Sequence, residues 1–267
     1  MKQFLSAGIR RYKRQLDENG YMVLRNFLPP EDQKRFVQMG SAAFEGEAQG
    51  CRHHSNEVAH FIISDACSVQ FSNSLWIGEH SSGASHFLQT IFEKAFATDL
   101  ATLYLGPSAI FGARIQLVKS RHVARVPSVI PYVPHFDRVR TLKFYFYLSD
   151  VAATGGHLYV GDACWVKQSE AIRSLYKKSS HSYLEIPDDA LREYTGGFTK
   201  VEAALGDIVV FDSSQPHFHG PVHEGQERVV LIFEVQSFDE VMYGYNVALQ
   251  QSLEVAKRES VDKSAVA

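Results

Sequence analysis

The N-terminal third of the chain has the apolar spacing of helices. Within 4–20, apolar residues recur every three or four positions and the run stops at Gly20, which predicts a helix. Residues 21–28 predict a short strand. In 29–45, two prolines and then acidic residues open the next segment, which suits the start of a helix because its dipole favours negative charge there. A further helix is expected over 85–106.

From residue 108 onward, the pattern changes to short runs rich in β-branched and aromatic residues, separated by Gly, Pro, Asp and Ser. Such runs predict strands. They are 109–120, 142–151, 156–162, 198–205, 207–214 and 227–238. Several short strands after a helical block predict a mainly β protein, a barrel or sandwich with helices packed outside.

No internal repeat or linker divides the chain, so we expect a single domain over 1–267. It would comprise a helix-rich part over 1–107, a β core over 108–240 and a C-terminal helix and tail over 241–267. Within the core, 167–197 is expected to be a helical insertion. Residues 46–80 carry no clear pattern.

Composition narrows the class of protein. Of 267 residues 45% are hydrophobic, and the net charge is -3, so the strongly basic character of nucleic-acid-binding proteins is missing. No apolar run approaches the roughly 18 residues that a membrane span needs. Cys51, Cys67 and Cys164 are scattered, which disfavours a disulfide framework. We expect a cytoplasmic protein that binds neither nucleic acid nor membrane. The sequence does not indicate its oligomeric state.

His135 and Asp137 lie two residues apart, just before a predicted strand. Residues i and i+2 of an extended segment point to the same side, so the imidazole and the carboxylate face a common point. A third ligand has candidates in His217, His219 and His223. Two histidines and one carboxylate form the facial triad of non-haem Fe(II) oxygenases, which leaves coordination positions open.

Four segments in order resemble the phytanoyl-CoA hydroxylase-like branch of the Fe(II)/2-oxoglutarate-dependent oxygenases. They are "LDENGYMVLRNFLPPEDQKRF", "PHFDRVRTLKFYFYLSDVAATGGHLYV", "GDIVVFDSSQPHFHGPV" and "ERVVLIFEV". The resemblance implies a double-stranded β-helix, or jelly-roll, core. It also implies Fe(II), 2-oxoglutarate and O2 as the cofactors, and oxidation of a substrate C–H bond with release of succinate and CO2.

Carried over by position, His135 and Asp137 match the family's first two iron ligands. His217 fits the third, because Gly220 follows at plus three and Arg228 at plus eleven. His219 is the alternative third ligand, and it also matches a position that contacts the co-substrate in the family. His223 ranks below both.

Arg228 is the candidate for the far carboxylate of 2-oxoglutarate. A buried dicarboxylate needs a cation that stays charged and binds in a bidentate manner, and Arg does both. By resemblance, Tyr145 and Gln116 line the same pocket; ordinary sheet packing is the competing interpretation for each. Asp137 occupies a position where related halogenases carry a small residue, which favours hydroxylation, desaturation or cyclisation over halogenation.

The resemblance has one departure: "VGDACWV" (160–166) stands where many relatives carry a Gly-Ser-His element. The resemblance therefore assigns no substrate contacts to that loop. His53, His54 and His60 are either anion-binding or ordinary loop residues. The expected substrate is a small metabolite.

Two other functions compete with the oxygenase. One is a cupin-type hydrolase or isomerase using Zn(II) or Mn(II), and the other is a barrel that binds a small molecule without turnover. Arg228 argues against the first, since a hydrolase has no need of it. The complete set of triad and arginine argues against the second.

Overall fold

The computed structural model describes residues 2–45, 52–55, 59–64, 96–107, 109–125, 131–137, 140–162, 183–185 and 197–237. Its helices are α1 (Lys2–Asn19), α2 (Pro30–Glu45), α4 (Phe96–Leu105) and α5 (Val151–Thr154). Its strands are β1 (Tyr21–Leu24), β2 (Arg52–Ser55), β3 (Ala59–Ser64), β4 (Ala109–Arg121), β5 (His135–Asp137), β6 (Thr141–Tyr147), β7 (Leu158–Gly161), β8 (Tyr183–Glu185), β9 (Phe198–Val201), β10 (Ile208–Asp212), β11 (His217–His219) and β12 (Glu227–Ser237).

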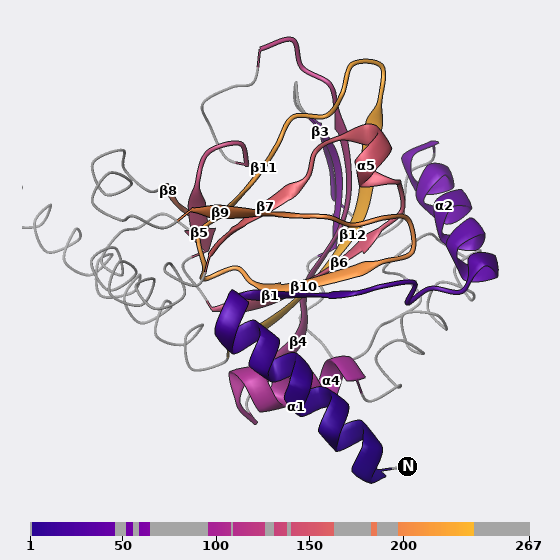
Figure 1. Ribbon diagram of the computed structural model, residues 1–267. Coiled ribbons are helices and arrows are strands. Elements are labelled where there is room, and N and C mark those ends of the chain that lie inside the picture. The colour runs from indigo at the N-terminus through magenta and orange to yellow at the C-terminus, as the bar shows by residue number, and fades with distance from the viewer. Residues whose placement is uncertain are drawn as a thin grey trace, which may run out of the picture.

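The described strands form two antiparallel sheets that face each other (Figure 1). The larger has the order β1-β10-β6-β12-β4-β3-β2 and the smaller the order β8-β5-β11-β7-β9. Strands β4 to β7, and again β9 to β12, alternate between the two sheets along the chain. This is a jelly-roll core with helices outside, and the predicted fold class is confirmed.

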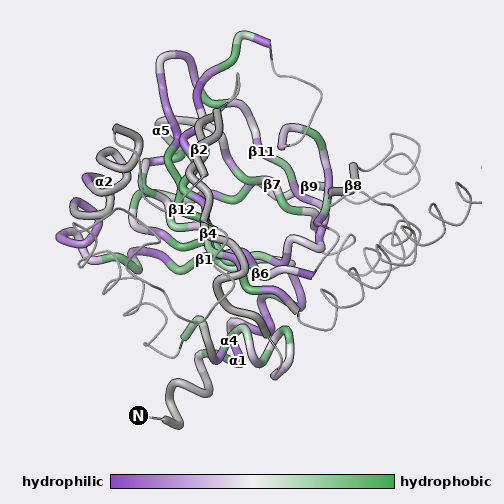
Figure 2. Tube along the Cα trace, turned by 180° about the vertical axis from the view of Figure 1, so that it is seen from behind, coloured by the Kyte–Doolittle hydropathy of each residue, from purple (hydrophilic) through white to green (hydrophobic). Residues whose placement is uncertain are grey.

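An apolar cluster fills the space between the two sheets. The larger sheet contributes Val209, Val230 and Ile232 to it, and the smaller sheet contributes Leu158 and Val160. Side chains on a strand alternate between its two faces, so every second residue of β10 and β12 points into this space. Hydrophobic stretches follow β12 and its neighbours in Figure 2.

Helices α1 and α4 lie side by side beneath the larger sheet (Figure 1). Leu16 of α1 and Leu100 of α4 are both fully buried in a second cluster, together with the outward-facing Phe144 and Phe233. Tyr12 and Phe96 join the two helices through an edge-to-face contact with ring centroids 5.4 Å apart. The amphipathic face expected for 4–20 is therefore the one that covers the sheet.

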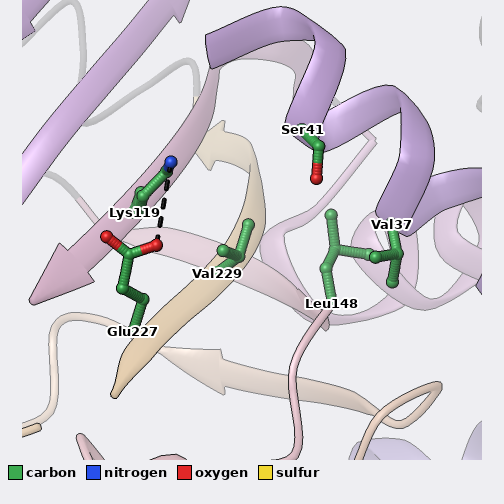
Figure 3. Close-up of a pocket in the computed structure, with 6 residues that line it drawn as sticks. All are labelled: Val37, Ser41, Lys119, Leu148, Glu227 and Val229. Atoms are coloured by element: carbon green, nitrogen blue, oxygen red, sulfur yellow. Dashed lines mark ion pairs between the residues drawn. The ribbon is translucent and has the colours of Figure 1, made fainter. Parts of the chain in front are cut away.

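Helix α2 borders a small cavity on the outer side of the larger sheet (Figure 3). Val37 and Ser41 line one wall, and an ion pair of 3.8 Å between Lys119 and Glu227 lies at its rim. The cavity measures about 320 Å³ including its opening to solvent. Val229, which also lines it, packs with the outer cluster, so this cavity faces away from the space between the sheets.

Several expected strands are shorter in the structure: those expected over 21–28 and 198–205 end at Leu24 and Val201. The strand expected over 142–151 ends at Tyr147, because Asp150 accepts a hydrogen bond from the Ala152 amide and caps α5. Strands β2 and β3 fall in 46–80, where no pattern was visible, and pair with each other and with β4.

Other expected segments lie outside the described residues. These are 85–95, the C-terminal part over 241–267, and the insertion over 167–197 apart from β8 and Gly197. Among the described helices, none is long and apolar enough to cross a lipid bilayer.

The packing of α4 leads to a stability prediction. Leu100→Ala removes a fully buried side chain and should lower the free energy of unfolding by about 2–5 kcal/mol through lost burial and a cavity. Leu103→Ala, on the same helix but 44% exposed, is the matched control and should change it by less than about 0.5 kcal/mol. Urea denaturation measures both, and equal effects would contradict the assigned packing.

Candidate functional site

A group of three side chains from two distant segments meets in the space between the sheets. His135 and Asp137 come from β5 and His217 from β11, and strand pairing places His217 directly opposite His135. One possible ligand atom of each lies within 4.8 Å of the other two, and all three residues are buried. Among the described residues, this is the one cluster of His, Cys, Asp or Glu side chains that meets this geometry.

The backbone orients both imidazoles. Nδ1 of His135 lies 2.8 Å from the Val133 carbonyl oxygen, and Nδ1 of His217 lies 2.9 Å from that of Gln215. A carbonyl only accepts, so each Nδ1 carries the proton and donates it. The lone pair of each ring is then on Nε2, which is the arrangement in which histidines bind metals.

The protonation states also suit a cation. Burial holds the pKa of His217 well below its usual range, so this ring is neutral at pH 7. Burial by itself raises the pKa of Asp137, but the Lys143 ammonium 2.7 Å from Oδ2 and the neighbouring histidines together lower it to about 2. Asp137 is therefore a carboxylate at neutral pH.

Lys143 is itself enclosed. Burial lowers the pKa of its ammonium, while the Asp137 and Glu234 carboxylates raise it to a net value above its usual range. Glu234 Oε1 lies 3.6 Å from Nζ. Lys143 is therefore an ammonium at neutral pH, in contact with a member of the cluster.

The turn between β10 and β11 fixes the two ligand segments to each other. The Asp137 amide donates to the Ser213 carbonyl at 2.8 Å, and the Ser213 amide donates to the Thr141 carbonyl at 2.9 Å. Asp212 stabilises the turn by accepting from the Ser214 amide, and its other oxygen accepts from the Tyr104 hydroxyl at 2.9 Å. Helix α4 is thus tied to the turn that carries His217.

Arg228 lies in the same space, at the start of β12, and is 3% exposed. Its Nη1 donates to the Gly156 carbonyl at 2.7 Å and to Nδ1 of His219 at 2.8 Å, and Nη2 donates to Ser120 Oγ at 3.0 Å. Gly156 has φ +72°, and a Cβ there would lie 3.1 Å from Arg228 Cδ. This glycine is therefore needed both for its backbone conformation and for the room it leaves the guanidinium.

Three polar atoms of this region are buried and have no hydrogen-bond partner among the described residues: Asp137 Oδ1, Arg228 Nε and the Tyr147 hydroxyl. Such atoms cost about 1–3 kcal/mol each when left unpaired, so each needs an explanation. The carboxylate oxygen suits a cation held with the two imidazoles, while Arg228 and Tyr147 are donors that suit an anion.

The structure separates the two candidates for the third ligand. His217 joins the cluster, whereas His219 lies against Arg228, and its ring stacks on Tyr145 at 5.8 Å between centroids. Since Nδ1 of His219 accepts from Arg228, its proton is on Nε2, which is 3.5 Å from the Tyr145 hydroxyl. His219 thus has the opposite tautomer to His217. His223 is exposed and bonds to the Ala153 carbonyl.

Gln116 lies on β4 opposite Ile232 of β12, and it is half-buried. It has the strand parity of Val118, which belongs to the cluster between the sheets. The structure therefore puts Gln116 on the inner face of the larger sheet. His53, His54 and His60 lie on β2 and β3, and their side chains are outside the described part, as is the 163–166 portion of the departing loop.

Three residues of this region were not identified from the sequence as site residues: Ser120, Lys143 and Tyr147. Lys143 and Tyr147 share the strand parity of Tyr145, which is a signal visible in "LKFYFYL". Ser120 has no such signal, because it meets Arg228 only through the pairing of β4 with β12. The ion pair between Lys143 and Asp137 and the pairing of β4 with β12 are visible only in the three-dimensional structure.

No protein-family profile matches this chain, and a comparison with curated protein sequences finds no match. Solved structures do match. The chain is similar to the epimerase SnoN in complex with Fe3+, alpha ketoglutarate and nogalamycin RO, with TM-score 0.61 and 11% identity over 87% of this chain and 84% of that one.

Two further matches are of the same kind. The carbocyclase SnoK from nogalamycin biosynthesis, described as non-heme and alpha ketoglutarate dependent, gives TM-score 0.58 and 14% identity over 85% of this chain and 83% of that one. A prolyl hydroxylase from Trichoplax adhaerens, in complex with a peptide fragment of the hypoxia inducible factor, gives TM-score 0.55. Its sequence identity is 14% over 89% of this chain and 93% of that one. At these identities the likeness establishes a shared fold.

The buried histidines predict an acid-sensitive fold for the metal-free protein. His217 and His219 have a lowered pKa in the folded state, so below about pH 6.5 the unfolded chain binds protons that the folded one does not. The free energy of unfolding should therefore decrease as the pH is lowered, by at most about 2.7 kcal/mol per pH unit for two such rings. Asp137 adds a loss at lower pH, as the pH falls from its unfolded value of about 3.9 toward its folded pKa of about 2.

Urea denaturation of chelator-treated protein between pH 7 and pH 5 measures this slope. His219→Gln removes one of the two titrating rings and should reduce the slope by up to half. A flat profile in the unsubstituted protein would contradict neutral, buried imidazoles.

Proposed function

We propose that this protein is a non-haem Fe(II)/2-oxoglutarate-dependent dioxygenase that hydroxylates a C–H bond of a small-molecule metabolite, with succinate and CO2 as co-products. One observation carries the proposal: a buried His135–Asp137–His217 cluster and a buried guanidinium, Arg228, share the space between two sheets of a jelly roll. The similarity in fold to SnoN, which binds Fe3+ and alpha ketoglutarate, supports it. The phytanoyl-CoA hydroxylase-like branch remains part of the proposal.

In this proposal His135, Asp137 and His217 hold the iron. Two neutral imidazoles and one carboxylate are the donor set that non-haem Fe(II) oxygenases use, and the unpartnered Asp137 Oδ1 is directed at no other described group. Bound with 2-oxoglutarate, the iron supplies oxidation of a substrate C–H bond by O2. The chain orients both rings through the carbonyls of Val133 and Gln215, which accept from Nδ1 and leave Nε2 toward the metal.

The far carboxylate of 2-oxoglutarate is assigned to Arg228, with Tyr147 as a second donor. Both have an unpartnered buried polar atom, and a carboxylate accepts from each. His219 accepts from Arg228 and so fixes the orientation of the guanidinium, while Tyr145 packs on the His219 ring and forms a wall of the pocket. Gln116 faces the same interior from β4.

The surrounding residues have a second task, which is to exclude water. Val230, Ile232 and Val209 line the interior beside the polar residues. A dry interior strengthens the interaction of Arg228 with an anion and limits side reactions. We take 1–267 as one catalytic unit, with a small metabolite as its partner and no nucleic acid.

The competing functions receive less support. A hydrolase or isomerase of cupin type would leave Arg228, Tyr147 and their buried, unpartnered atoms without a purpose. The similar structures include an epimerase and a carbocyclase as well as a hydroxylase, so this fold serves more than one reaction. Product analysis by mass spectrometry separates them: hydroxylation adds one oxygen, ring closure or desaturation removes two hydrogens, and epimerisation leaves the mass unchanged.

Removal of a metal ligand should abolish turnover. His135→Ala or Asp137→Ala should reduce succinate formation from 2-oxoglutarate by at least about 1,000-fold, because the iron is then incompletely held. Circular dichroism checks that the variants remain folded, and His223→Ala, an exposed histidine outside the cluster, should keep the unsubstituted rate. Unsubstituted succinate formation in either ligand variant would show that the assignment is wrong.

Changes in the anion pocket should instead weaken co-substrate binding. Anaerobic titration of the Fe(II) protein with 2-oxoglutarate, followed through the visible charge-transfer band, gives Kd. Arg228→Gln should raise Kd about 100-fold through loss of a charged hydrogen-bond donor. Tyr147→Phe should raise it about 5- to 10-fold. Tyr145→Phe keeps the stacked ring and should change Kd by less than about threefold. A larger effect for Tyr145 than for Tyr147 would reverse their assigned roles.

A further inference from the structure

A buried ammonium lies against the proposed metal carboxylate. Lys143 Nζ is 2.7 Å from Oδ2 of Asp137, and its other carboxylate neighbour is Glu234, at 3.6 Å. Lys143 is 8% exposed and Glu234 is 4% exposed. A cation beside a metal site repels the metal, so this position needs a reason.

The strands account for how Lys143 reaches Asp137. Glu234 on β12 is directly opposite Lys143 on β6, and such cross-strand neighbours on one face are close enough for their side chains to interact. Lys143 has the parity of Tyr145, which faces the interior. The β6–β12 pair therefore presents a charge pair to the interior, and the ammonium end of it meets Asp137.

The two oxygens of Asp137 are in different situations. Oδ2 is engaged by Lys143, while Oδ1 is buried without a hydrogen-bond partner. A free carboxylate binds a metal through one oxygen or through both. With Oδ2 engaged by Lys143, Oδ1 is the oxygen of this carboxylate left available to a metal.

We propose that Lys143, braced by Glu234, is a positioning residue that reserves Oδ2 of Asp137, so that the metal is held through Oδ1 alone. This inference rests on the proposed function. An octahedral ion held by two imidazoles and one carboxylate oxygen keeps three positions open. A chelating 2-oxo acid needs two of them and O2 the third, and a carboxylate bound through both oxygens would occupy one of these. Lys143 thus weakens metal binding and keeps the third position open.

The test uses the full-length protein and Mn(II), which binds oxygen and nitrogen ligands without starting the reaction. The free Mn(II) signal in electron paramagnetic resonance gives Kd. Lys143→Met alone leaves two buried carboxylates without their ammonium and endangers folding. The variant used is therefore Lys143→Met combined with Glu234→Gln. Glu234→Gln alone is the matched control, because it keeps the ammonium on Oδ2.

The double variant should bind Mn(II) about tenfold more tightly than the unsubstituted protein or more, since a buried repelling charge is removed and the second oxygen is released. Glu234→Gln alone should show no gain. Crystal structures with Mn(II) should show Oδ1 alone on the metal in the unsubstituted protein and both oxygens in the double variant. A residue that merely supported the fold would weaken binding when removed, so the sign of the change separates the two roles.

Equal or weaker Mn(II) binding by the folded double variant, or Oδ1 alone on the metal in both crystals, overturns this inference. If the double variant does not fold, Lys143→Gln with Glu234→Gln is measured in its place; it removes the repelling charge but keeps a neutral hydrogen-bond donor near Oδ2, so a smaller gain is expected, with Oδ1 alone on the metal. The proposed function fails separately, if the unsubstituted protein binds neither Mn(II) nor Fe(II) or shows no charge-transfer band with 2-oxoglutarate.

Discussion

The pairing of β5 with β11 is the interaction on which the site depends. It sets His217 opposite His135, although 82 positions separate them in the chain, and the bond from the Asp137 amide to the Ser213 carbonyl holds the same two segments together. Backbone hydrogen bonds between strands fix side-chain positions more firmly than loops do, and a metal site requires ligand atoms in a narrow range of distances. The rest of the fold supports this contact: α4 reaches it through the bond from Tyr104 to Asp212.

Under the proposed function, the interior between the sheets has one end suited to a cation and one end suited to an anion. Asp137 with two imidazoles lies at one, and Arg228 with Ser120 and Tyr147 lies at the other. Alternation along β6 presents Lys143, Tyr145 and Tyr147 in sequence to the same face, so a single strand spans both ends. A 2-oxo diacid has a chelating end and a plain carboxylate end, and this order of side chains matches it.

Hydrogen bonding gives neighbouring histidines different roles. His217 and His219 both come from β11 and point to the same side, yet one donates from Nδ1 to a backbone carbonyl and the other accepts at Nδ1 from Arg228. The first therefore has its lone pair on Nε2 and the second has its proton there. Their chemistry is decided by the group that meets Nδ1, which is a property of the surroundings and not of the residue type.

The sequence by itself determined the class of fold, because strand and helix periodicities are local properties. It also predicted that His135 and Asp137 face one point, since residues two apart on a strand share a side, and the family resemblance led to Arg228 as the cation for a buried diacid. Spacing within the resemblance favoured His217 over His219, and the tertiary structure placed His217 in the cluster and His219 against Arg228. It alone brought Ser120 to Arg228 and Lys143 to Asp137, because these contacts depend on the register between strands and on a turn far away in the chain, and no periodicity in the sequence encodes that register.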